Sequence, residues 1–270
     1  MHEILGGGGL AATVDVEHGA RIVSLVSDRR EWLSSSFPRP VGSAREFVHE
    51  GTGGWDDAIP TVEACVLPGG EALADHGEVW DRSWQATLVT ASRLDVAITL
   101  ESLPLRLERR MAATSAGLRF EWTVSTRALR RVSFLWSAHP LFAAPPGTTV
   151  VLDDGTIPAL VEEYPRRGAA VPMPRSIDAL AEGAALKAFC FGSSSASVIR
   201  PDGRGLRLSW DAGKLPVLGL YFDRGEFTSR PVVAVEPTMA ASDSAARAGR
   251  LWSVARGHPV SWAIDISPRE

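Results

Sequence analysis

The chain has 270 residues, of which 45% are hydrophobic and 22% charged, and its formal net charge is −4. This composition is typical of a globular protein, and the length allows one large domain or two modest ones. A nucleic-acid partner is disfavoured, because it would call for a basic balance and here 32 acidic side chains outnumber 28 basic ones.

Alternation of apolar and polar residues dominates the sequence and predicts β-strands with one buried face. A first strand pair is expected after the turn at 19–20, where the apolar residues of 22–26 lead to Trp32-Leu33. The same alternation predicts further strands at 96–100, 118–124, 206–210 and 260–266. Clusters of Pro, Gly and Asp between them, such as 145–147 and 201–203, favour turns.

Helical periodicity is scarce. Short helices are expected only at 176–187, which opens with Ser176 and Asp178 as caps, and at 243–248. A parallel α/β sheet needs a helix between successive strands, and these two segments do not supply enough of them. We therefore predict an all-β fold, a β-sandwich or barrel, with 1–270 forming one domain because no segment has the character of a linker.

The two cysteines, Cys65 and Cys190, lie 125 positions apart and do not resemble a disulfide framework or a structural zinc site. The first residues lack the basic and apolar regions of a secretory leader, and no apolar run approaches the roughly 20 residues of a membrane-spanning helix. These features favour a reduced, cytoplasmic compartment.

Several apparent motifs lack the context that their chemistry needs. The glycine run at 6–9 has neither the spacing nor the following helix of a phosphate-binding loop. Gly192-Ser193-Ser194-Ser195-Ala196 lacks the final glycine and the strand-to-helix turn of a nucleophile elbow. Asp75 and His76 are too few to define a metal site, so no metal is expected.

Two apolar segments end in an ionisable residue followed by proline. The run at 132–138 is followed by His139-Pro140, and the run at 232–235 is followed by Glu236-Pro237. A residue before proline is held in an extended conformation, so both side chains are expected to have fixed directions at the ends of strands. Such a His and Glu can act as an acid and a base, although capping a strand at the surface is the simpler interpretation.

A third region favours a site. The segments 53–60 and 75–84 lie close in sequence, and both combine Trp with Asp, Glu, His or Arg in turn-like contexts. Sugars are bound by such combinations, because an aromatic face packs on ring C–H groups while charged side chains hydrogen-bond the hydroxyls. Trp55, Trp80 and Trp84 are therefore expected near a pocket, whereas the Trp residues on alternating strands are expected in the core.

At these residues the chain resembles the aldose 1-epimerase (galactose mutarotase-like) superfamily. The similar segments occur in the order typical of that superfamily and span most of the chain: Gly19-Ala20-Arg21-Ile22, Gly53-Gly54-Trp55-Asp56-Asp57 with Pro60, Asp75-His76-Gly77, Ser137-Ala138-His139-Pro140-Leu141-Phe142, Val235-Glu236-Pro237 and Gly257-His258-Pro259 with Trp262.

The resemblance implies a large antiparallel β-sandwich, the galactose mutarotase-like supersandwich, with a sugar pocket on a concave face. It also implies cofactor-independent ring opening, in which Glu236 takes the proton of the anomeric hydroxyl and His139 protonates the ring oxygen. His76 would be a second donor beside the ring oxygen, and Arg82 would bind hydroxyls. Asp57, Trp55 and Trp80 complete the expected substrate-binding set.

The chain departs from the superfamily pattern at some positions. It contains no Asn, it reads His139-Pro140-Leu141-Phe142 where better-known galactose mutarotases have a His-x-x-Tyr-Phe segment flanked by Asn, and it has Trp80 where relatives that act on hexose 6-phosphates have Arg. The sugar and its phosphorylation state therefore stay open. Two other functions also stay open: a non-catalytic sugar-binding protein, and a glycoside-processing enzyme in which Asp56 or Asp57 pairs with Glu236.

Overall fold

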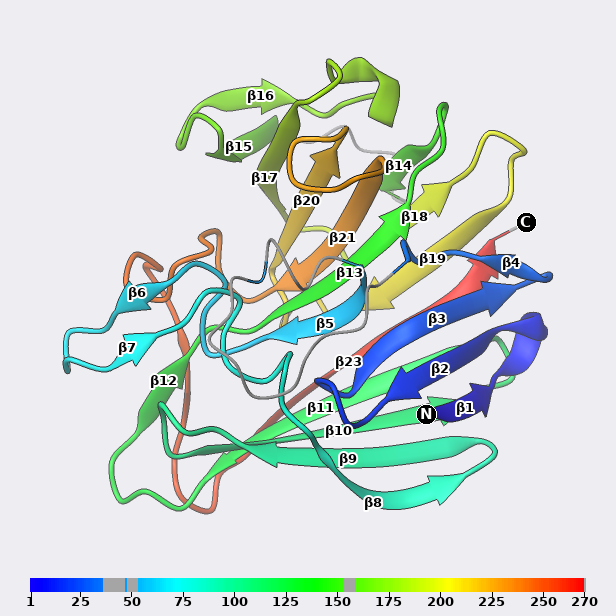
Figure 1. The fold of residues 1–270 in the computed structure, drawn as a ribbon. Coiled ribbons are helices and arrows are strands. Elements are labelled where there is room, and N and C mark those ends of the chain that lie inside the picture. Colours follow the sequence, from blue (N-terminus) through cyan, green and yellow to red (C-terminus); the bar gives the residue numbers. More distant parts are fainter. Residues whose placement is uncertain (36–46, 48–52, 153–158, 270) are drawn as a thin grey trace.

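The computed structural model describes residues 1–35, 47, 53–152 and 159–269. These residues form two large antiparallel β-sheets that pack face to face, with short turns and little helix (Figure 1). The predicted fold class, a large antiparallel β-sandwich, is confirmed. Within the described residues, no helix is long and apolar enough to cross a membrane.

The first sheet has eleven strands in the described part of the chain, and its centre is formed by β5, β13, β21 and β20. In spatial order it contains β1 (His2–Leu5), β2 (Ala11–Asp15), β3 (Arg21–Ser27), β5 (Gly54–Ala58), β13 (Ser137–Ala143), β21 (Val232–Thr238), β20 (Val217–Asp223), β17 (Ala185–Phe191), β15 (Ala159–Tyr164) and β16 (Ala170–Pro172), and β4 (Arg30–Glu31) pairs with β3.

The second sheet packs against the first and has eight strands among the described residues. Its order is β14 (Thr149–Leu152), β18 (Ser195–Ile199), β19 (Gly205–Trp210), β23 (Val260–Arg269), β11 (Leu118–Thr126), β10 (Leu105–Ala113), β9 (Arg93–Thr99) and β8 (Gln85–Thr90). Two small antiparallel pairs complete the strands described: β6 (Cys65–Val66) with β7 (Ala72–Leu73), and β12 (Val132–Phe134) with β22 (Trp252–Val254).

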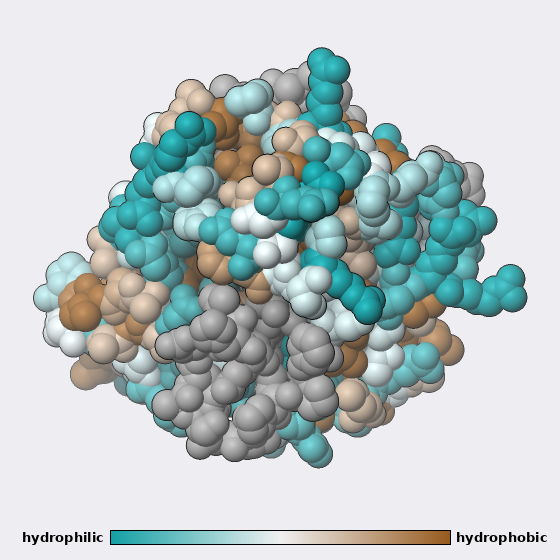
Figure 2. Space-filling model, turned by 45° about the horizontal axis from the view of Figure 1, so that its top comes forward, coloured by the Kyte–Doolittle hydropathy of each residue, from teal (hydrophilic) through white to brown (hydrophobic). Residues whose placement is uncertain are grey.

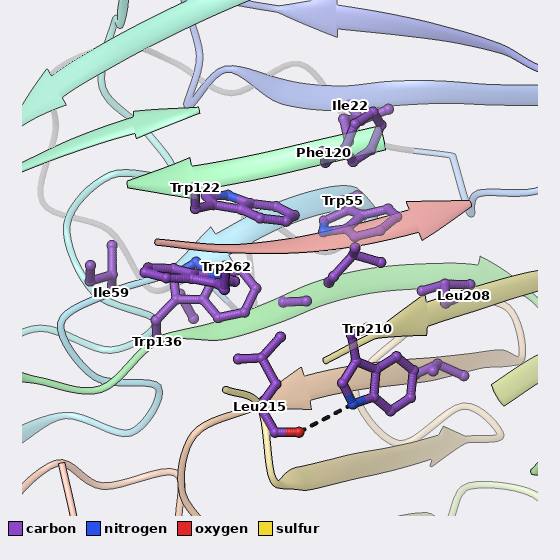
Figure 3. Close-up of a cluster of buried hydrophobic side chains, with 14 of the residues drawn as sticks. Ile22, Trp55, Ile59, Phe120, Trp122, Trp136, Leu208, Trp210, Leu215 and Trp262 are labelled. Atoms are coloured by element: carbon purple, nitrogen blue, oxygen red, sulfur yellow. Dashed lines mark hydrogen bonds between the residues drawn. The ribbon is translucent and has the colours of Figure 1, made fainter. Parts of the chain in front are cut away.

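The core between the sheets follows the alternation seen in the sequence. Along β11 every second side chain, from Leu118 to Val124, is fully buried, as a strand with one inward face requires. Trp122, Trp136 and Trp262 pack together, with ring centroids 4.8 Å apart for Trp136 and each of the other two (Figure 3). Such aromatic contacts add to the stabilisation from burial.

The two expected helices are not present. In the segment 176–187 only the single 3₁₀ turn Ile177–Ala179 forms, and the last residues of the segment belong to β17. A second 3₁₀ turn lies at Gly7–Gly9. The segment 243–248 is a turn with one helix-like hydrogen bond, from the amide of Ala248 to the carbonyl of Ser244. Burial of the alternate side chains of β17 against the sheet outweighed the weak helical preference of this alanine-rich stretch.

Candidate active site

A cavity of about 240 Å³ lies on the face of the first sheet that is turned away from the second sheet. At roughly 30 Å³ for each water molecule it would hold about eight waters, which is the scale of one small ligand. Its walls combine aromatic and ionisable side chains: Phe47, Val62, Glu63, Asp75, His76, His139, Leu141, Glu163, Tyr164, Arg167, Lys187, Tyr221, Phe227, Thr228, Glu236 and Asp243. This is the composition of a polar ligand site with apolar contact surfaces.

His139 and Glu236 are brought together by strand register. The pairs Ser137 with Thr238 and Phe142 with Val233 join β13 to β21, and the same register places His139 directly opposite Glu236. Residues directly opposite on antiparallel strands project from the same face, so both side chains enter the cavity. Neither residue ends its strand, contrary to the sequence-based expectation: β13 and β21 continue through the prolines.

Those prolines explain why the ladder between the two strands is interrupted at the site. Pro140 and Pro237 have no N–H to donate, and no β13–β21 pair is formed at these positions. Each strand is still held on its other edge, where Pro140 lies opposite Trp55 and Pro237 lies opposite Leu218. The backbone around His139 and Glu236 is thus extended and held by the neighbouring strands β5 and β20.

His76 enters the cavity from a tight turn. It adopts a left-handed conformation with φ of 55°, and Gly77 follows with φ of 73°. A side chain at Gly77 would lie 1.9 Å from the carbonyl oxygen of Ile59, so only glycine allows the turn to pack here. Asp75 Oδ2 accepts a hydrogen bond from His76 Nδ1 at 2.9 Å, which orients the imidazole. The ring centroids of His76 and His139 are 4.9 Å apart.

Phe47 completes the aromatic side of the cavity. Its ring stacks on His76 with a centroid separation of 3.8 Å and meets His139 edge-on at 5.2 Å. Trp80 also contacts Phe47 edge-on, with a centroid separation of 5.2 Å. The side chain of Trp80 is buried and does not line the cavity, whereas Phe47 does.

The carboxylate of Glu236 is almost completely buried and unevenly satisfied. Its Oε2 accepts a hydrogen bond from the ammonium group of Lys187, whereas Oε1 has no hydrogen-bond partner among the described residues. Burial raises the pKa of Glu236 above the ordinary value of a glutamate, and the positive charge of Lys187 opposes that rise. A carboxylate with a raised pKa and a free lone pair is suited to act as a general base.

Lys187 was not anticipated from the sequence. It lies on β17 and is 6% exposed, and its ammonium group is also 3.7 Å from Asp243 Oδ1. Burial lowers the pKa of a lysine, but Asp243 and Glu236 together outweigh this, so the pKa of Lys187 is raised and the group is charged. A signal was available: Lys187 is one of only two lysines, and it sits in an otherwise apolar stretch, 185–191.

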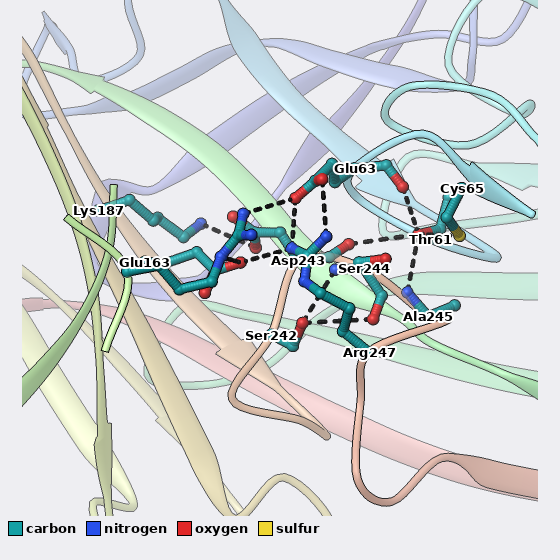
Figure 4. Close-up of polar contacts among 11 residues, drawn as sticks. Thr61, Glu63, Cys65, Glu163, Lys187, Ser242, Asp243, Ser244, Ala245 and Arg247 are labelled. Carbon is teal, nitrogen blue, oxygen red and sulfur yellow. Dashed lines mark hydrogen bonds and ion pairs between the residues drawn. The ribbon is translucent and has the colours of Figure 1, made fainter. Parts of the chain in front are cut away.

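Ion pairs close the rim of the cavity beyond Lys187 and Asp243 (Figure 4). Arg247 binds both oxygens of Glu63 and also donates to Glu163 at 2.9 Å. Arg167 contacts the same two carboxylates at 3.1 and 3.2 Å. Both arginines are therefore committed to protein carboxylates. On the face of the molecule shown in Figure 2, hydrophilic and hydrophobic residues are intermixed.

Trp55 and Asp57 lie on the opposite face of β5, which corrects their expected role in sugar binding. Trp55 is fully buried between the sheets, near Phe120 in the aromatic core (Figure 3). Asp57 is likewise buried, with Oδ2 paired to Arg109 at 2.8 Å and Oδ1 accepting from Trp136 Nε1 at 3.1 Å. Both side chains share one strand face, and the register of β5 turns that face toward the second sheet.

Arg82 also lies outside the cavity. Its guanidinium contacts Glu101 at 2.9 Å, Glu78 at 3.5 Å and the carbonyl oxygen of Thr99 at 3.2 Å, next to the second sheet. Trp84 is buried, and its Nε1 donates to the carbonyl oxygen of Val79. Of the expected site residues, the structure thus brings together His76, His139 and Glu236, with Trp80 behind Phe47.

The arrangement supports proton transfer between a ligand and protein side chains. It provides a buried carboxylate, two imidazoles and a charged lysine around a space of single-ligand size. Among the described residues, no group of three or more His, Cys, Asp or Glu side chains is placed to hold a metal ion.

Comparison with solved structures identifies the fold. A galactose mutarotase-like protein from Lactobacillus casei superposes with a TM-score of 0.76 at 17% identity, over 100% of both chains. A candidate aldose 1-epimerase from Escherichia coli superposes with a TM-score of 0.75 at 15% identity, over 99% of this chain and 98% of the other. A galactose mutarotase related enzyme from Lactobacillus acidophilus gives 0.74 at 13% identity, over 100% and 97%.

The sequence itself matches no protein-family model and no curated protein. The similarity in structure nevertheless extends over essentially the whole chain, and it shows that this protein has the galactose mutarotase-like fold that its motifs indicated. At identities of 13–17% the similarity establishes the fold and leaves the chemistry to be argued from the site.

Proposed function

We propose that the protein is an aldose 1-epimerase-like isomerase that interconverts the anomers of a sugar or sugar derivative. The observation that carries this proposal is the placement of His139 directly opposite Glu236 in a cavity of single-ligand size. An acid and a base on facing strands can act on two oxygens bonded to the same carbon, which is what opening of a sugar ring requires.

In the proposed reaction the carboxylate of Glu236 takes the proton from the anomeric hydroxyl while His139 gives a proton to the ring oxygen. The bond between the anomeric carbon and the ring oxygen breaks, and the anomeric carbon becomes an aldehyde. After rotation about the adjacent carbon–carbon bond, the ring hydroxyl adds to the other face of the aldehyde. Glu236 returns its proton to the new anomeric oxygen and His139 regains one, so no net proton, electron or cofactor is consumed.

The remaining cavity residues fit supporting roles. His76, oriented by Asp75, is a second donor for the ring oxygen. Phe47, Tyr221 and Phe227 offer aromatic surface to the C–H groups of a sugar ring, and they take the place that the sequence had suggested for Trp55 and Trp80.

The glycoside-processing alternative is weakened, because neither of its two candidate aspartates lines the cavity with Glu236. The carboxylate of Asp57 lies between the sheets, bound to Arg109. The carboxylate of Asp56 is not part of the cavity wall and lies 4.0 Å from the guanidinium of Arg21.

The proposal is tested by dissolving pure anomers of a panel of aldoses, with and without a 6-phosphate, and following the approach to equilibrium by polarimetry. We expect at least one sugar to equilibrate at a rate that rises linearly with protein concentration. Absence of acceleration for every sugar would overturn the proposal. If calorimetry then detected sugar binding that Glu236→Ala left unchanged, the protein would instead be a non-catalytic sugar-binding protein.

A further inference from the structure

Lys187 reaches Glu236 across an intervening strand. In the first sheet β17 and β21 flank β20, and the row that contains Glu236 continues through Gly219 to Phe189. A Cβ atom at Gly219 would lie 3.3 Å from both the Cβ and Oε2 of Glu236. The absence of a side chain at Gly219 therefore leaves the space in which the carboxylate and the ammonium group meet.

Burying this ion pair on the face of the sheet costs desolvation free energy. The side chains of Lys187 and Glu236 are only 7% and 1% exposed, so both charges are removed from water. A buried ion pair often contributes no more stability than two well-packed apolar residues would. Its position on the wall of the cavity, beside His139, points to a role in the chemistry of Glu236.

We propose that Lys187 is the positioning residue of Glu236. Its ammonium group holds Oε2 and keeps the carboxyl group ionised, which leaves Oε1 as the atom that takes the proton from the anomeric hydroxyl. Asp243 holds the ammonium group from the other side. The inference rests on the proposed function and adds a residue that the resemblance did not supply.

The two charged neighbours of Glu236 shift its pKa in opposite directions, so removing each of them should have opposite effects. The positive charge of Lys187 lowers the pKa of Glu236, whereas the negative charge of Asp243 raises it. Other described ionisable groups around this pair are His139 on β13, His76 on the turn, Tyr221 on β20 and Glu163 on β15, whose negative charge acts on Lys187. All four residues are retained in every variant below.

The test is the dependence of kcat and KM on pH for the wild type and for Lys187→Met, Lys187→Arg and Asp243→Asn. For Lys187→Met we expect the acidic limb of the profile to move to higher pH by about one unit or more, because a neighbouring opposite charge shifts a pKa by roughly 1–3 units. Below the limb kcat should fall about tenfold per unit, with KM nearly unchanged. Lys187→Arg should retain the wild-type limb, and Asp243→Asn should move it to lower pH.

The chain offers a matched control, since Lys214 is the only other lysine. Its ammonium group is on the exposed side of the second sheet, where it donates to the carbonyl oxygen of Ser261. Lys214→Met removes the same charge from the whole protein and should leave the pH profile unchanged. A similar shift in both lysine variants would mean that overall charge, and not the contact with Glu236, sets the limb.

Three other results would overturn the inference while leaving the proposed function intact. The limb of folded Lys187→Met could coincide with that of the wild type. KM could rise manyfold at constant kcat, which would mean that Lys187 binds the sugar directly. If circular dichroism showed that Lys187→Met does not fold, the pH profile of Asp243→Asn would be the test. An acidic limb that stayed in place or moved to higher pH in that variant would contradict the inference.

If the wild type accelerated no anomer exchange, the proposed function would fail and the inference would be tested without activity. The carboxyl carbon of Glu236 can be titrated by ¹³C NMR in the wild type and in Lys187→Met. A higher pKa of Glu236 in Lys187→Met supports the inferred role of Lys187, and equal pKa values in the two proteins overturn it.

Discussion

Two buried pairs of a carboxylate and a cation lie on opposite faces of the same sheet, and they differ in how completely they are satisfied. Between the sheets, both oxygens of Asp57 have partners, Arg109 and Trp136. On the cavity face, Glu236 is bound to Lys187 through one oxygen only. Burial raises the pKa of both carboxyls. A fully satisfied buried charge joins two layers of a fold, whereas a partly satisfied one is available to a substrate.

The largest effect is expected from removing the charge on the cavity face. Glu236→Gln keeps the shape of the side chain and abolishes the base, so kcat should fall by about 10²–10⁴-fold, the usual contribution of a general acid or base. The melting temperature should fall as well, because the buried ammonium group of Lys187 loses one carboxylate partner and keeps only Asp243. Steady-state kinetics on folded protein check this, and a variant of wild-type activity would remove Glu236 from the mechanism.

Asp57→Asn is the matching change on the core face. It leaves Arg109 charged and buried without its partner, which typically costs about 3–5 kcal/mol of folding free energy. We expect denaturant unfolding to show that loss, and kcat per folded molecule to stay within a few-fold of the wild type. A stable but inactive Asp57→Asn protein would place this carboxylate in the chemistry after all.

A smaller effect is expected at Gly219, beneath the base. In Gly219→Ala the added methyl group must push Glu236 by a few tenths of an ångström, and we expect kcat to fall about tenfold with a stability loss of about 1–3 kcal/mol. Gly205→Ala is the control, because its Cβ would be crowded at 3.1 Å by the carbonyl oxygen of Val198, far from the cavity. Equal loss of activity in the two variants would contradict the geometric argument.

The smallest effect is expected at Arg82, whose ion pairs with Glu78 and Glu101 are partly exposed. Exposed pairs contribute about 0–1 kcal/mol, so Arg82→Ala should alter neither the melting temperature nor kcat/KM appreciably. A thermal melt checks the first, and the same kinetic assay at a saturating and a limiting sugar concentration checks the second. A large rise in KM would restore the hydroxyl-binding role that the motif order had suggested.

The strands were predictable because alternation is a direct consequence of one buried face. A different pattern singled out His139 and Glu236, because each is an ionisable residue between an apolar run and a proline. Alternation does not reach every strand. It could not place Asp57, because every residue of β5 is buried and burial on both faces erases the alternation. The direction of its side chains is set by the register with β13, which is a property of the assembled sheet.

Lys187 shows a different limit. Its segment has many residues that favour helices, and the sequence therefore predicted a helix that ends at Lys187. A helix prediction does not say which side chains share one face of a strand. Its contact with Glu236 joins positions 49 residues apart through an intervening strand. Such a pair is decided by the strand order of the sheet, which local patterns do not contain.

The most direct test of the central claim is two-dimensional NMR exchange on an aldose at anomeric equilibrium, recorded with wild type, Glu236→Gln and Asp57→Asn at equal concentrations of folded protein. We predict exchange cross-peaks between the anomers with the wild type and with Asp57→Asn, and none above the spontaneous rate with Glu236→Gln. Cross-peaks of equal intensity with Glu236→Gln and the wild type would contradict the claim that this carboxylate opens the ring.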